Sequence, residues 1–259
     1  MQRRQFLQTS ALATALLGGM PLSATAKSAK GKVVVIGGGY GGATAAKYLR
    51  MLSGNQLDVT LVEPNSTFVS CPMSNLVVGG IRKINEISTP YTGLTRNHGV
   101  KMVKDYVTAI DVEKRTVKLK NGKTLPYDKL VLSPGIDLQL DKIEGLAAAN
   151  ASGQILQAWK AGPETVGLRK QLEAMPDGGT YALSIPLAPY RCPPGPYERA
   201  CQVASYFKKA KPKSKVVIFD ANDDITSKKG LFMKAWADHY AGMIEYRPKH
   251  KVVDVDVAT

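Results

Sequence analysis

Apolar runs and helical stretches alternate along the first part of the chain. Residues 32–36 form an apolar run rich in β-branched side chains, which predicts a buried parallel strand. A glycine-rich turn follows at 37–42, residues 43–52 have the composition of a helix, and residues 58–62 predict a second strand. Strand, turn, helix and strand make a βαβ unit, so the pattern predicts an α/β fold with a doubly wound parallel sheet.

Short strands dominate the next part of the chain. Residues 64–90 show no regular pattern, and we expect them to be irregular. The dipeptide Asn121-Gly122 predicts a tight hairpin turn. The strands expected around it lie at 101–103, 107–112, 116–120, 123–125 and 130–132.

A second α/β unit is expected after residue 145. Its predicted helices lie at 163–174, 197–209 and 229–240, and its predicted strands at 181–185, 215–219 and 251–257. The chain stops directly after the last predicted strand, so we expect further sequence after Thr259. The whole pattern predicts two Rossmann-like modules, at 27–145 and 146–259.

Composition excludes several classes of protein. The chain has 259 residues, 44% hydrophobic and 22% charged, which is typical of a globular protein and not of a disordered one. Three cysteines are too few for a disulfide scaffold. No apolar run approaches the roughly 20 residues that a membrane-spanning helix needs. No ligand spacing typical of zinc occurs, so we expect no metal.

The chain is basic, with a formal net charge of +14. Its lysines are dispersed in short groups, and no segment combines closely spaced Lys or Arg with aromatic residues that could stack on bases. This pattern disfavours a nucleic-acid binder. A basic face that meets an acidic protein partner explains the charge better, because complementary potentials steer association.

The first 26 residues predict an export signal. Arg3-Arg4 forms a twin-arginine pattern, residues 11–17 are mildly apolar, and Ala24-Thr25-Ala26 offers small residues for a signal peptidase. A frayed basic tail is the alternative. We expect export of the folded chain to the periplasm by the twin-arginine route, where disulfides can persist.

Gly37, Gly39 and Gly42 form the pattern G-x-G-x-x-G between a predicted strand and a predicted helix. In dinucleotide-binding folds the first glycine permits a tight turn, the second lets a pyrophosphate approach the backbone, and the third lets helix and strand pack closely. Glu63 lies 21 residues after Gly42, at the end of the second predicted strand, where a carboxylate can accept hydrogen bonds from ribose hydroxyls. These positions predict a dinucleotide site.

Both NAD and FAD bind through this pattern. Its position at the start of the exported chain favours FAD, as in flavoproteins of two modules. The strand at 130–132 ends in Ser133-Pro134-Gly135, which resembles the strand, small residue and glycine that return the chain toward the FAD in such proteins. We therefore expect FAD, with Gly135 among its contacts.

The second module lacks a glycine fingerprint. After the strand at 181–185, residues 186–196 include five prolines. Proline fixes the backbone, and the bulky side chains of this stretch obstruct a pyrophosphate. We therefore expect no nicotinamide nucleotide here, and electrons must leave the flavin for another acceptor.

The cysteines carry the remaining candidate chemistry. Cys192 precedes a predicted helix, whose dipole together with Arg191 favours a thiolate and a redox role; a buried structural thiol is the alternative. Glu198 is either a base beside it or an acid that favours the helix dipole. Cys201 falls inside the helix, where packing is expected, although a disulfide with Cys192 is a second possibility. Cys71 lies in a loop and reads as an inert thiol from its residues alone.

The export signal and three motifs together resemble the flavoprotein subunit of flavocytochrome c sulfide dehydrogenase, a relative of the sulfide:quinone oxidoreductases. The three motifs are 33–42, Cys71-Pro72-Met73-Ser74-Asn75 with Gly79-Gly80, and Cys192-Pro193-Pro194-Gly195-Pro196-Tyr197-Glu198-Arg199. The resemblance implies the fold of FAD-dependent disulfide reductases, with a C-terminal part missing. It also implies that Cys71 links covalently to the 8α-methyl carbon of the flavin, that Cys192 is one half of a redox-active disulfide, and that Glu198 is a base beside it.

The implied activity is oxidation of sulfide to sulfur or polysulfide. FAD takes two electrons and releases them singly to a c-type cytochrome subunit, since no Cys-x-x-Cys-His occurs in this chain to hold a haem. The partner cysteine is expected beyond Thr259, so this fragment alone is expected to be inactive. Two alternatives stay open, namely a sulfide:quinone oxidoreductase and a non-catalytic flavoprotein partner of a sulfur-oxidising complex.

Overall fold

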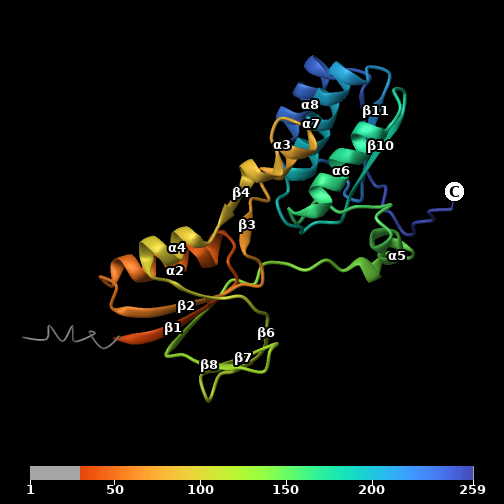
Figure 1. Ribbon diagram of the computed structural model, residues 1–259. Helices are drawn as coiled ribbons and strands as arrows, with labels where there is room; N and C mark the ends of the chain where they lie inside the picture. Colours follow the sequence, from red (N-terminus) through yellow and green to blue (C-terminus); the bar gives the residue numbers. More distant parts are fainter. Residues whose placement is uncertain (1–29, 259) are drawn as a thin grey trace, which may run out of the picture.

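A four-stranded parallel sheet forms the centre of the first lobe of the molecule (Figure 1). The structure, a computed structural model, describes residues 30–258, and the export signal expected at 1–26 lies outside the described residues. The strands pair in the order β5-β2-β1-β9. They are β1 (Gly31–Ile36), β2 (Leu57–Val62), β5 (Lys101–Val103) and β9 (Lys129–Leu132).

The central strand β1 is buried on both faces, which explains its continuous apolar run. Val33 and Val35 pack with Ala46 of α2 (Tyr40–Leu52), while Val34 packs on the opposite side with Val117. Successive strand residues point to opposite faces, so one strand contributes to two hydrophobic clusters. Helix α4 (Thr92–His98) lies beside α2. The opposite face is covered by an antiparallel sheet of β6 (Val107–Asp111), β7 (Thr116–Leu119) and β8 (Thr124–Pro126).

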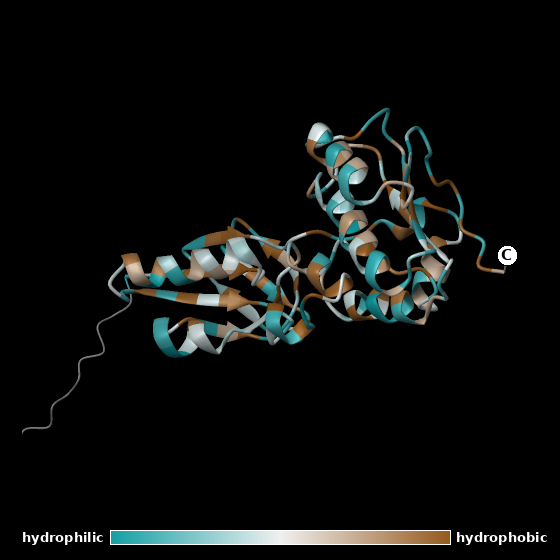
Figure 2. Cartoon of the chain, turned by 90° about the horizontal axis from the view of Figure 1, so that it is seen from above, coloured by the Kyte–Doolittle hydropathy of each residue, from teal (hydrophilic) through white to brown (hydrophobic). Residues whose placement is uncertain are grey.

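The second lobe contains a three-stranded parallel sheet in the order β10-β11-β12. Tyr197 and Phe207 are fully buried at the centre of its hydrophobic cluster. Figure 2 shows hydrophobic and hydrophilic residues alternating along the helices, as in amphipathic helices that cover a sheet. The elements are α6 (Pro163–Ala174), β10 (Thr180–Ile185), α7 (Gly195–Ala210), β11 (Lys215–Asp220), α8 (Lys229–His239) and β12 (Ile244–Arg247). The predicted α/β class with parallel sheets is confirmed.

The strand predicted at 251–257 is wrong. The third strand of the second sheet is β12, whose Tyr246 packs on Trp236 and donates a hydrogen bond from its hydroxyl to Asp220 (3.1 Å). The alternation of valine and aspartate at 253–257 has the period of a strand but no apolar surface to cover, and Val253 is 68% exposed. It joins the fold through a bridge between Asp254 and Glu144.

Residues 64–90 are not irregular, contrary to expectation. Strand β3 (Thr67–Val69) pairs antiparallel with β4 (Ser88–Pro90). Between them the chain forms α3 (Ser74–Val78) and the short 3₁₀ helix η1 (Ile84–Ile87). Each element has three to five residues, too few to produce a readable period.

Helix α3 leaves the first lobe and packs on α6 and α7 of the second, as Figure 1 shows. Val78 belongs to the hydrophobic cluster of the second lobe, and its carbonyl accepts a hydrogen bond from Arg169 of α6 (3.3 Å). The approach is close, because a Cβ on Gly79 would lie 3.0 Å from Oε1 of Gln202. This contact carries Cys71, three residues before α3, to the second lobe.

A buried lysine closes the C-terminal end of α6. The ammonium of Lys211 donates to the carbonyls of Leu172 and Glu173, each at 2.7 Å, and to that of Met175. These carbonyls have no partner within the helix, and a cation also interacts favourably with the dipole at this end. Lys211 therefore ties the end of α7 to the end of α6.

We predict that Lys211→Met lowers the free energy of unfolding by about 2 kcal/mol, because it leaves buried carbonyls without donors. Urea denaturation followed by circular dichroism measures this. The matched control is Lys209→Met on the exposed surface of the same helix, expected to change stability by less than about 0.5 kcal/mol. Equal losses in the two variants would contradict the role of the cap.

Candidate functional site

A cavity of about 550 Å³ lies at the carboxyl ends of β1, β2 and β9, where ligands of open α/β sheets bind. It brings together five residues predicted from the sequence, namely Gly37, Gly39, Glu63, Cys71 and Gly135. The other three predicted residues lie outside its lining. Gly42 packs behind the turn, and Cys192 and Glu198 lie in the adjoining part of the second lobe.

The three fingerprint glycines are glycines for different reasons. Gly37 has φ +91°, and a Cβ there would lie 2.0 Å from the Ser133 carbonyl oxygen. A Cβ on Gly42 would lie 1.8 Å from the carbonyl oxygen of Gly37. Packing therefore leaves no room for a side chain at Gly37 or Gly42. Gly39 has an ordinary φ of −67°, and a Cβ there would meet no protein atom within 4 Å. Its missing side chain leaves room for a ligand in the cavity.

Glu63 is held in place by three hydrogen bonds. Its Oε2 accepts from the backbone N–H of Gly38 (2.7 Å), and its Oε1 accepts from the backbone N–H and the side-chain amide of Asn65 (2.9 and 2.7 Å). A carboxylate has about four acceptor positions, so one remains for a ribose hydroxyl. The side chain is buried at the end of β2, as its predicted role requires.

Tyr91 supports the glycine turn through a hydrogen bond, a role that the sequence did not predict. Its hydroxyl donates to the carbonyl of Gly38 (2.8 Å). Burial, together with the nearby Glu63 carboxylate, raises the pKa of Tyr91 above its ordinary value, so the phenol remains a donor. Its only local signal was a position before α4, which marks no function.

The cavity offers positive potential to an anion. It opens at the N-terminus of α2, whose first turn has free backbone N–H groups and no acidic residue. Lys160 and Arg191 also line it. Arg191 belongs to the proline-rich loop of the second lobe, so both lobes contribute to the wall. The donor set fits a phosphate-bearing dinucleotide.

Cys71 lies on the cavity wall with its thiol free and half-buried. Its Sγ donates to the backbone carbonyl of Trp159 at 3.0 Å. The same carbonyl accepts from Arg191 (3.4 Å), and the Trp159 ring packs edge-on against Tyr190. Trp159 thus connects the Cys71 loop with the loop that carries Cys192, although nothing in the sequence marked it.

Cys192 is exposed between β10 and α7, which does not fit a buried structural thiol. Its φ of +54° is a left-handed conformation that residues with a side chain seldom adopt. Its carbonyl accepts from the N–H of Gly195 (2.9 Å), and a Cβ on Gly195 would lie 3.3 Å from its Sγ. The sulfur therefore lies at the first turn of α7, where the loop position predicted it.

The other two candidates of this helix differ in burial. Glu198 is exposed in the first turn of α7. Cys201 packs against the hydrophobic cluster of the second lobe, and its Sγ accepts a hydrogen bond from the indole N–H of Trp236 (3.3 Å). Burial raises the pKa of the Cys201 thiol. Cys201 is free and not bonded to Cys192, in agreement with the expected packing role.

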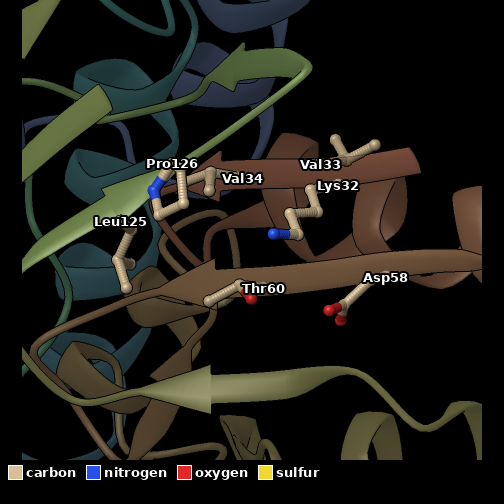
Figure 3. Close-up of a pocket in the computed structure, with 7 residues that line it drawn as sticks. All are labelled: Lys32, Val33, Val34, Asp58, Thr60, Leu125 and Pro126. Carbon is tan, nitrogen blue, oxygen red and sulfur yellow. The ribbon is translucent and has the colours of Figure 1, made fainter. Parts of the chain in front are cut away.

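A smaller cavity of about 180 Å³ lies on the first sheet, away from the cysteines (Figure 3). One of its two charged lining residues, Asp58, already pairs with Lys101 (2.8 Å). Its lining comes from β1, β2 and β8, namely Lys32, Val33, Val34, Asp58, Thr60, Leu125 and Pro126. Within residues 30–258 there is also no cluster of His, Cys, Asp or Glu that could hold a metal, and no helix long and apolar enough to cross a membrane.

Two protein families match the chain. The family described as pyridine nucleotide-disulphide oxidoreductase matches residues 31–161. The family described as sulfide dehydrogenase [flavocytochrome c] flavoprotein chain, central, matches residues 165–259. The first match contains the glycine turn and Cys71, and the second contains Cys192 and Glu198.

Individual relatives are similar over different lengths. The sulfide dehydrogenase [flavocytochrome c] flavoprotein chain of Chlorobaculum thiosulfatiphilum is 61% identical over 46 residues, 18% of this chain and 94% of that one. Mitochondrial sulfide:quinone oxidoreductase of Mus musculus is 26% identical over 232 residues, 86% of this chain and 49% of that one. The structure of the Aquifex aeolicus sulfide:quinone oxidoreductase has a TM-score of 0.72 and 23% identity, with 87% of this chain and 52% of that chain covered. The chain thus spans about half the length of the latter two proteins.

We predict that Gly39→Val leaves the fold intact but abolishes dinucleotide binding, because its side chain meets open space that a pyrophosphate would need. Gly42→Val is the contrasting variant, in which the collision with the Gly37 carbonyl should lower stability by several kcal/mol. Bound flavin absorbance and thermal unfolding measure the two effects. A yellow Gly39→Val protein with wild-type flavin content would contradict the assignment of Gly39.

Proposed function

The chain belongs to the pyridine nucleotide-disulphide oxidoreductase family, among flavoproteins like sulfide dehydrogenase and sulfide:quinone oxidoreductase, and on this basis we propose that it belongs to an FAD-dependent enzyme that oxidises sulfide. One observation carries the proposal. The glycine turn, Glu63 and Cys71 line a single cavity, and Arg191 of the Cys192 loop lines it too.

The residues of this cavity fit FAD. The free N–H groups at the start of α2 suit the pyrophosphate, and the open side of Gly39 leaves room for it. The remaining acceptor position of Glu63 suits a ribose hydroxyl. Gly135, with φ +82°, turns the chain after β9 along the cavity. When bound, FAD supplies an acceptor for two electrons from sulfur.

Cys71 is the proposed attachment point of the cofactor. Its Sγ would hold FAD through a thioether to the 8α-methyl carbon, with the thiol and one methyl C–H each losing a proton and the flavin ring taking up the two electrons, which the proposed electron acceptor would then remove. The thiol hydrogen bond to Trp159 disappears with that proton. Covalent attachment suits an exported protein, because lost FAD could not readily be replaced in the periplasm.

Cys192 is the proposed site of sulfur chemistry. Hydrosulfide attacks a disulfide formed by Cys192, so that one cysteine becomes a persulfide and the other leaves as a thiolate. Among the described residues the other cysteines have separate environments, since Cys71 contacts Trp159 and Cys201 contacts Trp236. We therefore propose that the partner of Cys192 is a cysteine outside residues 30–258. Glu198, exposed one turn along α7, is the proposed base for the incoming hydrosulfide.

A c-type cytochrome subunit is the proposed electron acceptor, and the periplasm the proposed location. The match to the flavocytochrome c flavoprotein chain supports the acceptor, and residues 1–26 support the location. A quinone acceptor is the second candidate, favoured by the similarity to the mouse and Aquifex enzymes. Sulfide-dependent reduction of cytochrome c and of a quinone by the full-length protein separates the two. No turnover with either acceptor would favour a non-catalytic partner.

We predict that acid precipitation leaves flavin with the wild-type protein and releases it completely from Cys71→Ser, because the hydroxyl of serine forms no such thioether. Absorbance of pellet and supernatant measures the distribution. Cys201→Ser is the matched control and should keep its flavin. Flavin that washes free of the wild type would exclude the covalent link, and a peptide spanning 68–75 with the added flavin mass would locate it.

We predict that Cys192→Ser in the full-length protein abolishes reduction of the flavin by sulfide but leaves its reduction by dithionite unchanged, because dithionite needs no cysteine. Stopped-flow absorbance measures both rates. Cys201→Ala should retain most of the sulfide rate and lose roughly 1 kcal/mol of packing stability. The assignment is wrong if an active enzyme contains a Cys192–Cys201 disulfide.

A further inference from the structure

Tyr40 follows the second glycine of the fingerprint and is the first residue of α2. It is 56% exposed, and it lines the same cavity as Gly39 and Cys71. Its hydroxyl is nevertheless paired, since Oη of Tyr40 and Oγ of Ser70 form a hydrogen bond of 2.6 Å. The side chain is therefore open to the cavity, while its hydroxyl is tied to the residue directly before Cys71.

The strand before Cys71 is not part of the parallel sheet. Strands β3 and β4 form a separate two-stranded sheet, whereas the glycine turn follows β1 of the four-stranded sheet. Ladder hydrogen bonds therefore do not set the distance between the glycine turn and Cys71. Side-chain contacts have to do so, and Tyr40 makes two of them. Besides the hydrogen bond to Ser70, its ring packs edge-on against Phe68 of β3, with the centroids 4.9 Å apart.

Ser70 can pass its position on to Cys71 because the backbone around it is fixed. Ser70 is 4% exposed, and its N–H donates to the carbonyl of Ile87 (2.9 Å). The carbonyl of Cys71 accepts from both the N–H (3.0 Å) and the hydroxyl (2.7 Å) of Ser74. The backbone on both sides of the Cys71 side chain is thus held, so Ser70 and Cys71 move together.

Under the proposed function, FAD is held at both ends of this span. Its pyrophosphate lies at the start of α2, and its flavin ring is linked to Cys71. A bond forms rapidly only when the reacting atoms are held about 3–3.5 Å apart, and a misplacement of about 1 Å can slow a reaction about a hundredfold. A small change in the distance between α2 and Cys71 therefore affects the rate of attachment more than it affects binding.

We propose that Tyr40 is a positioning residue for covalent attachment of the flavin, and that its hydrogen bond to Ser70 sets the distance between the glycine turn and the Cys71 thiol. This inference rests on the proposed function, since it requires FAD in the cavity and a thioether at Cys71. The ring of Tyr40 and Phe68 form part of the cavity wall, and the hydroxyl ties that wall to the attachment point. Loss of the hydroxyl alone should slow attachment and leave non-covalent binding unchanged.

The rate of attachment in the full-length protein tests this. Apoprotein from riboflavin-limited cells is mixed with FAD in air, samples are precipitated with acid at intervals, and flavin absorbance of the pellet gives the linked fraction. Attachment leaves the flavin reduced by two electrons, and dioxygen in the buffer removes them with two protons as hydrogen peroxide. We expect attachment in Tyr40→Phe to be at least about tenfold slower than in the wild type, because the ring stays but the link to Ser70 is lost.

Three comparisons separate positioning from binding and from general damage. Ser70→Ala removes the other half of the hydrogen bond and should slow attachment equally, and the double variant should be no slower than either single variant, because each already breaks the same bond. Tyr48→Phe, at an exposed tyrosine of the same helix, should attach FAD at the wild-type rate. In a Cys71→Ser background, where no thioether forms, Tyr40→Phe should leave the Kd of FAD unchanged, as measured by quenching of flavin fluorescence.

A wild-type attachment rate in Tyr40→Phe overturns the inference. So do additive losses in the double variant, or a fall in FAD affinity in the Cys71→Ser background that equals the loss of rate. Thermal unfolding shows whether each apoprotein is folded, and Ser70→Ala decides if Tyr40→Phe is not. Flavin that acid always extracts from the wild type refutes the thioether of the proposed function, and this inference with it. The wild-type sample therefore distinguishes the two failures.

Discussion

The packing of α3 on α6 and α7 determines whether the two halves of the molecule share a site. This helix has five residues, and most of its side chains are buried in the second lobe although its flanking strands belong to the first. Val78 enters the hydrophobic cluster of the second lobe, and Asn75 reaches the backbone of α7. Without these contacts, Cys71 would lie on the surface of one lobe and Cys192 on the surface of the other. The cavity and the contacts that Trp159 makes with both cysteine loops depend on this crossing of α3 to the second lobe.

Features that depend on neighbouring residues were predictable, and those that depend on distant ones were not. The β-branched run of β1, the glycine turn and the helix α6 are determined by residues close together in the sequence, and they occur where the sequence predicted them. Tyr91, Trp159 and Arg199 act through partners tens of residues away, so no spacing could mark them. The wrong strand at 251–257 has the period of a strand at 253–257, where three valines alternate with two aspartates, but no sheet face is available for the valines to cover.

Two buried cations of the second lobe show how environment separates structure from chemistry. Lys211 ends α7 with three carbonyl acceptors around its ammonium, which leaves it no capacity for a further partner. Arg199 lies near the start of the same helix, where it donates to one carbonyl, and its buried Nε–H has no acceptor among the described residues. A saturated cation of this kind contributes to stability alone. An unsaturated one keeps a donor for a further partner.

The left-handed backbone of Cys192 sets stability against reactivity at a single position. A residue with a side chain costs roughly 1 kcal/mol or more in this conformation, whereas glycine adopts it freely. Selection for a robust fold alone would therefore drive this position toward glycine, with little disturbance to the exposed loop around it. Under the proposed role of Cys192, selection for sulfur chemistry acts in the opposite direction. In lineages that lost access to reduced sulfur, we expect this codon to be among the first in the gene to drift.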